Sequence, residues 1–162
     1  GFITTDLAID ENLLYEALQE VIKKTFNMVS VDRDTSTNDM VLLMANGLAK
    51  NSVITEKNKN YKLFLEALYH IAEYLAKSIA QDGEGATKLI ETKILNALTE
   101  KDAEKAAKAV IDSLLVKTAI FGRDPNWGRI LAAVGYSGAK IDPAKTDLYL
   151  KEKIVENGQP LV

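Results

Sequence analysis

The stretch SVDRDTSTNDMVLLMANG, residues 30–47, decides how this chain is expected to fold. Its first half is almost wholly polar and includes three carboxylates and several small hydroxyl or amide side chains: Asp32, Asp34, Thr35, Ser36, Thr37, Asn38 and Asp39. Its second half, residues 40–45, is an apolar run that ends at Asn46 and Gly47. Such a run between turn-forming residues predicts a buried strand. The polar half is then a loop between two core strands, residues 28–31 and 40–45.

Two interpretations fit the composition of this polar loop. Asp, Asn, Ser and Thr side chains commonly bond their own backbone, which would make the loop an ordinary turn. The same side chains could also form a binding site that the sheet holds in place, since functional residues concentrate on loops carried by rigid elements. Composition alone leaves both open.

The whole chain is compatible with a single domain spanning residues 1–162. Its hydrophobic fraction of 47% is enough for a real core, and 27% of its residues are charged. A net charge of -3 gives no indication of a nucleic-acid or membrane-surface partner. There is no cysteine, and His70 is the single histidine, so thiol chemistry and a multi-histidine metal site are excluded. We therefore expect no metal site and no cofactor.

Periodicity predicts strands and helices that alternate along the chain. The N-terminal half is expected to hold a strand at residues 2–9, a helix at 11–26 capped by Asp10, the two core strands, an exposed loop at 48–60 and a long amphipathic helix at 61–81. The C-terminal half is expected to hold a strand at 87–96, a helix from Thr99 or Asp102, an apolar connection at 115–121, a helix that begins at Pro125 with Asp124 as its cap, and strands at 145–155 and 159–162 around an Asn157-Gly158 turn. This order predicts an α/β or α+β fold with a mixed sheet covered by helices.

Two further polar clusters follow the long helix. In the first, Glu84 lies between Gly83 and Gly85, either as a solvated residue at a helix stop or as a carboxylate that can approach a ligand closely. The second is GRDPNWGR, residues 122–129, in which the single tryptophan, Trp127, is most simply a packing anchor.

Several kinds of site are excluded by pattern. The glycines at 83 and 85 lack the third glycine and the preceding strand of a phosphate-binding loop. A nucleophile elbow and a histidine-based triad are absent as motifs. The three aspartates of the polar loop lack the spacing and the terminal Glu of a calcium loop.

Four stretches together resemble the bifunctional ornithine acetyltransferase / glutamate N-acetyltransferase family of arginine biosynthesis. They are FITTDLAI at residues 2–9, SVDRDTSTNDMVLLMANG at 30–47, DGEGATKLI at 82–90 and DPNWGRILAAVGYSG at 124–138, in the family's order. Arg33 departs from the glycine expected in the family's VDGDTSTND, which could alter the turn but leaves DTSTND intact. The resemblance implies the N-terminal-nucleophile-like αββα fold shared with related aminopeptidases.

The resemblance also implies a reaction. In the family, a precursor cleaves itself before a threonine, which becomes the N-terminal nucleophile of the β chain and takes acetyl from N-acetylornithine for transfer to glutamate. The α chain supplies the oxyanion hole, and the assembly is expected to be an α2β2 heterotetramer in the cytoplasm. The resemblance leaves open whether acetyl-CoA is also a donor.

Within this chain, the resemblance places one site residue. The family's substrate-binding glutamate falls at Glu84, where a carboxylate suits the amino group of an amino acid. The nucleophile is expected just upstream of Gly1, so we expect no catalytic residue here, and neither Thr4 nor Thr5 is that nucleophile. The chain is therefore expected to be part of a β subunit that lacks both its first residues and its C-terminal end, and to expose apolar surface along residues 2–9 and beyond Leu161.

Two other functions stay open alongside this one. The first is a self-processing aminopeptidase of the related fold, against which DGEGATK argues. The second is a non-catalytic amino-acid-binding domain on the same scaffold. A threonine a few residues before Gly1, after a self-cleavage site, would favour the acetyltransferase.

Overall fold

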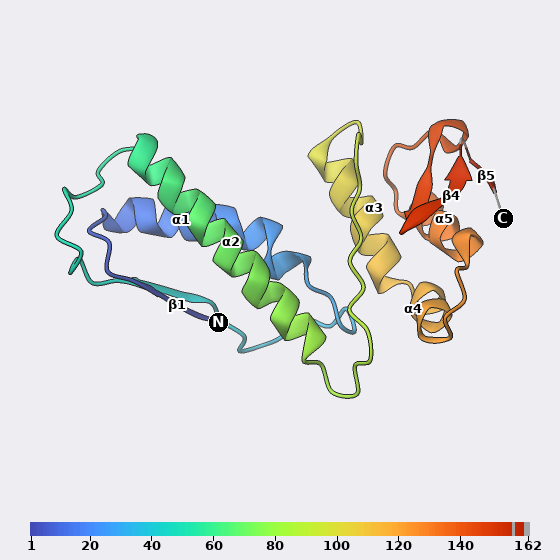
Figure 1. Ribbon diagram of the computed structural model, residues 1–162, viewed down its shortest axis with the longest axis horizontal. Helices are drawn as coiled ribbons and strands as arrows, with labels where there is room; N and C mark the ends of the chain where they lie inside the picture. The colour runs from blue at the N-terminus through green and yellow to red at the C-terminus, as the bar shows by residue number, and fades with distance from the viewer. Residues whose placement is uncertain (157, 161–162) are drawn as a thin grey trace. The chain divides into compact units, whose positions relative to one another are not determined.

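The computed structural model describes residues 1–156 and 158–160. The chain divides into two compact units, residues 1–85 and residues 86–162, which we describe separately (Figure 1). That the two units form one domain stays a prediction.

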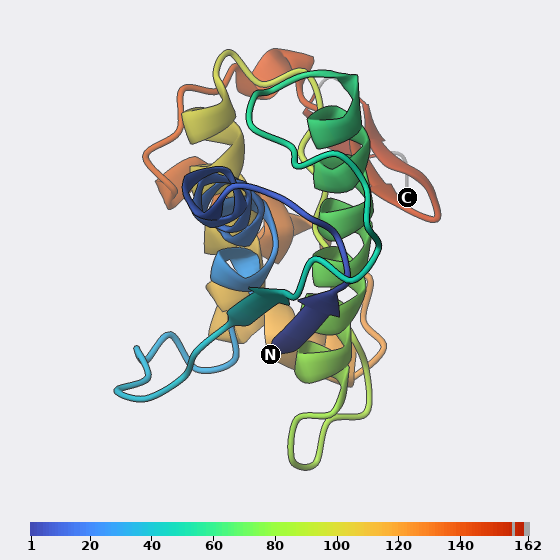
Figure 2. The ribbon, with the colours of Figure 1, turned by 90° about the vertical axis from the view of Figure 1, so that its left-hand side faces the viewer.

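Unit 1 is built around a parallel pair of strands joined through a helix. Strand β1 (Phe2–Thr5) is followed by helix α1 (Glu11–Lys24), the short 3-10 helix η1 (Phe26–Met28), strand β2 (Leu42–Ala45) and the long helix α2 (Lys59–Gln81). The strands pair from Phe2 opposite Leu42 to Thr5 opposite Ala45, and Figure 2 shows them side by side. Parallel neighbours need a crossover connection, and α1 with η1 provides it.

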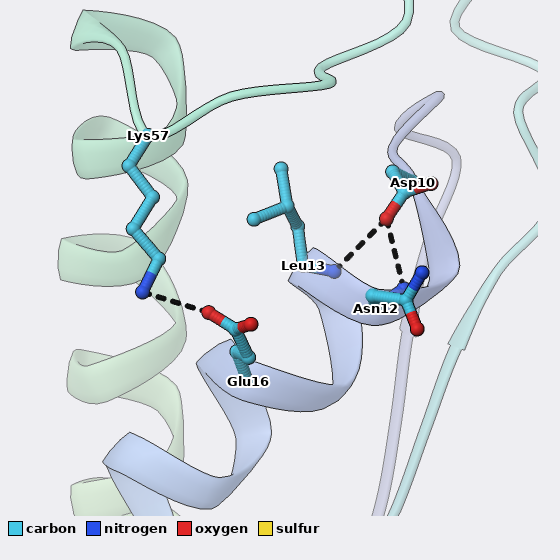
Figure 3. A network of polar contacts seen from close by, with 5 residues as sticks. All are labelled: Asp10, Asn12, Leu13, Glu16 and Lys57. Atoms are coloured by element: carbon cyan, nitrogen blue, oxygen red, sulfur yellow. Dashed lines mark hydrogen bonds and ion pairs between the residues drawn. The ribbon is translucent and has the colours of Figure 1, made fainter.

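Both helices of unit 1 begin where the sequence provides a cap. The Asp10 carboxylate accepts hydrogen bonds from the backbone N–H groups of Asn12 and Leu13, as predicted, which satisfies donors at the first turn of α1 (Figure 3). Asn58 caps α2 in the same way. Lys57, next to that cap, lies 2.7 Å from the Glu16 carboxylate on α1, but both side chains are about half exposed, so the pair adds little stability.

The core of unit 1 lies between the two helices and one face of the strand pair. It consists of the buried residues Ile3, Ala17, Val21, Ile54, Tyr61, Leu68 and Ala72. Val41, which immediately precedes β2, packs against it together with Leu43 of β2 and Phe26 of η1. The predicted long helix at 61–81 is therefore confirmed, with its start two residues earlier.

Two predictions for the central stretch are wrong in part. Residues 28–31 form no strand in this described region, because Met28 ends η1 and the chain then turns into the polar loop. The apolar run at 40–45 does contain a strand, β2, but its residues alternate between exposed and half-buried instead of being buried on both faces. A continuous apolar run predicts a strand that is covered on both faces. In unit 1, helices cover only one face of the strand pair, so every second residue of β2 stays exposed.

Unit 2 packs three helices and a small antiparallel sheet. Helices α3 (Glu100–Asp112), α4 (Leu114–Phe121) and α5 (Trp127–Tyr136) are followed by the 3-10 helix η2 (Pro143–Lys145) and strands β3 (Leu148–Leu150), β4 (Glu152–Glu156) and β5 (Gln159–Pro160). The strands pair in the order β3-β4-β5. The core of this unit consists of Ala106, Val110, Val116, Ile130, Ala133 and Val134.

A buried carboxylate joins the start of α3 to the segment that follows α5. Asp102 accepts a hydrogen bond of 2.7 Å from the Thr99 hydroxyl and one of 3.1 Å from the backbone N–H of Lys140. These bonds hold the pKa of Asp102 below its ordinary value. Thr99 is also the N-cap of α3, so the predicted helix start is confirmed.

Four predictions for unit 2 need correction. Residues 87–96 form no strand within the described chain, and residues 114–121 are the helix α4 instead of a connection. Helix α5 begins at Trp127 with Asn126 as its cap, so neither Asp124 nor Pro125 has the predicted role. The expected strand at 145–155 is two strands, because Lys151 at φ 64° turns the chain between Leu150 and Glu152. The predicted return strand is present as β5, while Asn157 of the predicted turn and residues 161–162 lie outside the described residues.

Candidate functional site

The β1–β2 ladder reaches Gly1, beside the end of the polar loop. The backbone nitrogen of Gly1 donates to the Met40 carbonyl at 2.8 Å, and the Gly1 carbonyl accepts from the Leu42 N–H at 2.9 Å. These two bonds continue the parallel pairing that begins at Phe2 and Leu42. The start of β1 is therefore fixed against the residue that follows Asp39.

The polar loop is fully exposed and partly organised by its own side chains. The Ser36 hydroxyl oxygen accepts from the backbone N–H groups of Asn38 and Asp39 at 3.3 and 3.1 Å, and Asp32 accepts from the N–H of Asp34 at 2.8 Å. These are the local bonds expected of an ordinary turn. Among the described residues, the carboxylates of Asp34 and Asp39 have no hydrogen-bond partner. The loop therefore has the turn geometry of the first interpretation and retains free polar groups that the second requires.

Glu84 lies just beyond the end of α2. The helix ends at Gln81, and its C-cap is Asp82, whose N–H donates to the Ser78 carbonyl at 3.0 Å. Gly85 follows at φ 71°, the left-handed region that glycine enters without steric cost. The Glu84 side chain is exposed and makes no hydrogen bond or ion pair within residues 1–156 and 158–160. Its carboxylate is free to meet a ligand, and its substrate-binding role stays a prediction.

Three features of unit 1 lie toward the same end of that unit. In both Figure 1 and Figure 2, the start of β1, the polar loop and the C-terminal end of α2 lie toward its lower end. Helix α2 also packs against η1, the segment that leads into the polar loop. Two of the three predicted polar clusters thus belong to one unit and one end of it.

The third cluster, residues 122–129, has a structural role within unit 2. Asn126 caps α5 by accepting from the Arg129 N–H at 3.1 Å, and its amide donates to Asp124 at 3.0 Å. The Arg129 guanidinium donates to the Leu115 carbonyl at 2.9 Å and to the Thr118 hydroxyl at 3.2 Å. These bonds tie α5 to α4. Trp127 is half-buried, in agreement with a packing role.

The other end of β1 carries an open hollow that is separate from these features. It has a volume of about 470 Å³, and Thr5, Asp6 and Asn60 are among its lining residues. Near this end, burial raises the pKa of Tyr61, and the hydrogen bond to Glu16 raises that of Lys57. In the described part of the chain, no three metal-ligating side chains form a group that could hold an ion, and no helix is long and apolar enough to cross a membrane.

Comparison with known proteins supplies the family. A family model described as the ArgJ family matches residues 1–162. This chain belongs to the ArgJ family. The arginine biosynthesis bifunctional proteins ArgJ of Symbiobacterium thermophilum and Caldanaerobacter subterraneus are 54% and 53% identical to it, over 99% and 98% of the chain. The chain spans about 40% of the length of these curated relatives.

A solved structure supports the fold. The crystal structure of the arginine biosynthesis bifunctional protein ArgJ from Bacillus halodurans matches with a TM-score of 0.94 and 46% sequence identity, covering 98% of this chain and 75% of that one. The α+β fold class and the family resemblance predicted from the four sequence stretches are both confirmed.

The contact between Gly1 and Phe26 was missed by the sequence interpretation. A Cβ atom at position 1 would lie 3.3 Å from Cζ and 3.4 Å from Cε1 of Phe26. The two residues are separated by the whole of α1, and periodicity placed Phe26 only on the buried face of that helix. A glycine at the start of a strand, where side chains usually add packing, was the one available signal.

Arg33, where the family resemblance predicts a glycine, adopts a backbone conformation that favours glycine. Its φ is 74°, in the left-handed region, which a non-glycine residue enters at a cost of about 1–2 kcal/mol. The turn before DTSTND therefore carries local backbone strain at Arg33.

Replacing Arg33 with glycine should stabilise the complete protein. Relief of the strain is opposed by the greater freedom of glycine in the unfolded chain, about 0.5–1 kcal/mol, so we expect a net gain of roughly 0.5–1 kcal/mol in the free energy of unfolding. Denaturant unfolding measures it. Arg33→Ala is the matched control, because it removes the guanidinium but keeps a Cβ. Equal stabilisation by alanine would show that the side chain, and not the backbone, is responsible.

Proposed function

We propose that this chain is part of the β subunit of an acetyltransferase that moves acetyl from N-acetylornithine to glutamate in arginine biosynthesis. The observation that carries the proposal is the match to the ArgJ family along the whole chain, with relatives named arginine biosynthesis bifunctional proteins at 54% and 53% identity. The proposal includes an α chain from the same precursor, an α2β2 assembly and a cytoplasmic location.

The geometry of β1 supports the position of the nucleophile in this proposal. In the family, the nucleophilic threonine lies a few residues before the stretch that corresponds to Gly1 and Phe2. If the parallel register of β1 and β2 continues, residues that precede Gly1 run beside Asp39 and Asn38. The threonine would then meet the free polar groups of the loop.

The chemistry is an acyl transfer in two steps. The threonine hydroxyl attacks the acetyl carbonyl of N-acetylornithine, its proton passes to the free N-terminal amine, and the C–N bond breaks as ornithine leaves with a proton. The uncharged amine of glutamate then attacks the acetyl-threonine ester, and its proton passes through the N-terminal amine to the threonine oxygen as the C–O bond breaks, which releases the threonine hydroxyl and N-acetylglutamate. Backbone or side-chain donors of the α chain stabilise the oxyanion in both steps.

Glu84 is proposed to hold the amino acid during both steps. Its carboxylate is exposed and unpaired among the described residues. Glu84 follows the C-terminal end of α2, and that end of the helix lies at the same end of unit 1 as the start of β1 (Figure 1). A carboxylate forms a strong charge-assisted hydrogen bond with an ammonium group. The acetylated nitrogen of N-acetylornithine is an uncharged amide, so the ammonium is supplied by the free side-chain amino group of the donor, and by the amino groups of ornithine as the product and of glutamate as the acceptor.

The test is acetyl transfer by the complete precursor. Self-cleavage into two chains, formation of N-acetylglutamate from N-acetylornithine, and an acetyl adduct on the N-terminal threonine in intact-mass spectra are expected. Replacing that threonine with alanine should abolish all three. Hydrolysis of peptides without acetyl transfer would favour the aminopeptidase, and amino-acid binding without turnover would favour the binding domain; either result would overturn the proposal.

A further inference from the structure

We propose that Phe26 is a positioning residue for the nucleophile: its ring supports Gly1 and thereby fixes where the preceding residues enter the site. The inference rests on the proposed function, because it concerns the threonine expected upstream of Gly1. It adds a residue outside every motif that identified the family.

The first step is the contact itself. A Cβ atom added to Gly1 would point at the ring of Phe26. It would lie 3.3 Å from Cζ and 3.4 Å from Cε1 of that ring, and 3.8 Å from Cγ1 of Val41. Ordinary contact begins near 3.4 Å, so a Cβ here requires the ring to move by a few tenths of an ångström. Glycine allows the strand backbone to lie directly against the ring.

The second step is that the ring has little freedom to move. Phe26 is half-buried and packs against the core of unit 1. Its backbone belongs to η1, which is anchored at Thr25, a buried residue whose hydroxyl donates to the Val21 carbonyl at 2.8 Å and whose carbonyl accepts from the Met28 N–H at 2.9 Å. Helix α2 packs against the same segment. Contacts with both α1 and α2 therefore limit how far the Phe26 ring can move.

The third step is that Gly1 is fixed in two directions at once. Its hydrogen bonds to Met40 and Leu42 hold it in the plane of the strand pair, and the ring supports it from the helix side. Only a few residues join Gly1 to the proposed nucleophile, so the position of Gly1 determines where the nucleophile lies. Since a displacement of about 1 Å can cost roughly 100-fold in rate, a few tenths of an ångström should cost several-fold.

The experiment is a double-mutant cycle in the complete, self-cleaved enzyme with Gly1→Ala, Phe26→Leu and the double variant. Gly1→Ala should lower kcat about 5- to 10-fold, with KM for both substrates within about twofold of wild type. Phe26→Leu removes the ring edge and should lower kcat about threefold, because Gly1 then lacks its support. The double variant should regain activity relative to Gly1→Ala, since the smaller side chain makes room for the Cβ.

Each outcome of the cycle bears on the proposal. A Gly1→Ala enzyme with wild-type kcat, or a double variant whose loss equals the product of the two single losses, would overturn it. Circular dichroism and melting temperature establish that each variant folds, and if Gly1→Ala does not fold, an unchanged kcat in Phe26→Leu overturns the inference by itself. An active wild-type enzyme with uncoupled variants rejects only the role of Phe26, whereas an inactive wild-type precursor rejects the proposed function and this inference together.

Discussion

Replacing Glu84 with Gln in the complete enzyme is expected to weaken apparent substrate binding by about 10- to 100-fold, because a charge-assisted hydrogen bond is worth about 1.5–3 kcal/mol. The exposed carboxylate makes no competing bond within the described residues, so its loss should leave the fold unchanged. Self-cleavage should survive, since that step involves no free amino acid. Steady-state kinetics with N-acetylornithine and glutamate, together with gel analysis of the cleaved chains, measure both effects.

The neighbouring Asp82 offers the matched control for this experiment. Asp82 is exposed and lies two residues away, so Asp82→Asn removes the same charge from the same helix end. It should change apparent binding by less than about twofold, because an exposed charge that does not bond the ligand directly interacts with it through water, where charge–charge energies are small. Wild-type kinetics for Glu84→Gln would show that Glu84 is only a solvated residue after a helix, and equal losses for both variants would indicate a general effect of charge.

The largest expected effect on stability is at Leu68, in the middle of α2. Leu68 is 4% exposed and belongs to the core of unit 1, so Leu68→Ala should cost about 2–5 kcal/mol through lost burial and the cavity left behind. Denaturant unfolding of the complete protein, followed by a signal from unit 1, measures it.

Leu63 on the same helix separates burial from helix propensity. It is 55% exposed, and Leu63→Ala makes the same chemical change, so its cost should stay within about 0.5 kcal/mol. A loss at Leu63 as large as that at Leu68 would contradict the burial assigned here and would show that another part of the protein covers this face of α2.

Elements with a one-sided apolar pattern could be predicted from the sequence. Helix α2 and the start of α1 at Asp10 follow from helical spacing and a capping side chain, both of which are local. Helix α4 was missed because LLVKTAIF is apolar on nearly every side and therefore shows no preferred face, although Ser113 provides its cap. Local signals identify a helix only when polar and apolar residues separate.

Strand errors arise because a strand depends on a partner that the sequence does not specify. Ile90, Thr92 and Ile94 are half-buried and alternate with exposed residues, but no neighbouring strand pairs with them among the described residues. In the reverse case, β3 and β4 read as one strand because Lys151 is not a typical turn residue, yet it adopts φ 64°. Alternation reports side-chain burial, whereas a strand also needs backbone hydrogen bonds to a second chain segment.

In the candidate site, too, local features could be predicted from the sequence and contacts between distant residues could not. Glu84 and the polar loop could be singled out because their residue types are unusual for their surroundings, and they belong to two of the four stretches that carry the family resemblance. The role of residues 122–129 in joining α5 to α4 could not be predicted, because it depends on the fold of unit 2. Likewise, the packing of Phe26 on Gly1 depends on a strand crossing that no local pattern encodes.

The pairing of β1 with β2 also constrains how unit 1 acquires its structure. Phe2 and Leu42 are neighbours in the sheet but are separated by the whole of α1, η1 and the polar loop in the chain. The backbone hydrogen bonds within α1 and α2 join residues that are close in sequence. The two strands can pair only after the long loop between them has closed, which costs conformational entropy. We therefore expect the helices to form early and β1 to join last. If the proposed nucleophile precedes Gly1, the strand that follows it would be in place only once the rest of the unit has folded, and self-cleavage would wait until the scaffold of the site is complete.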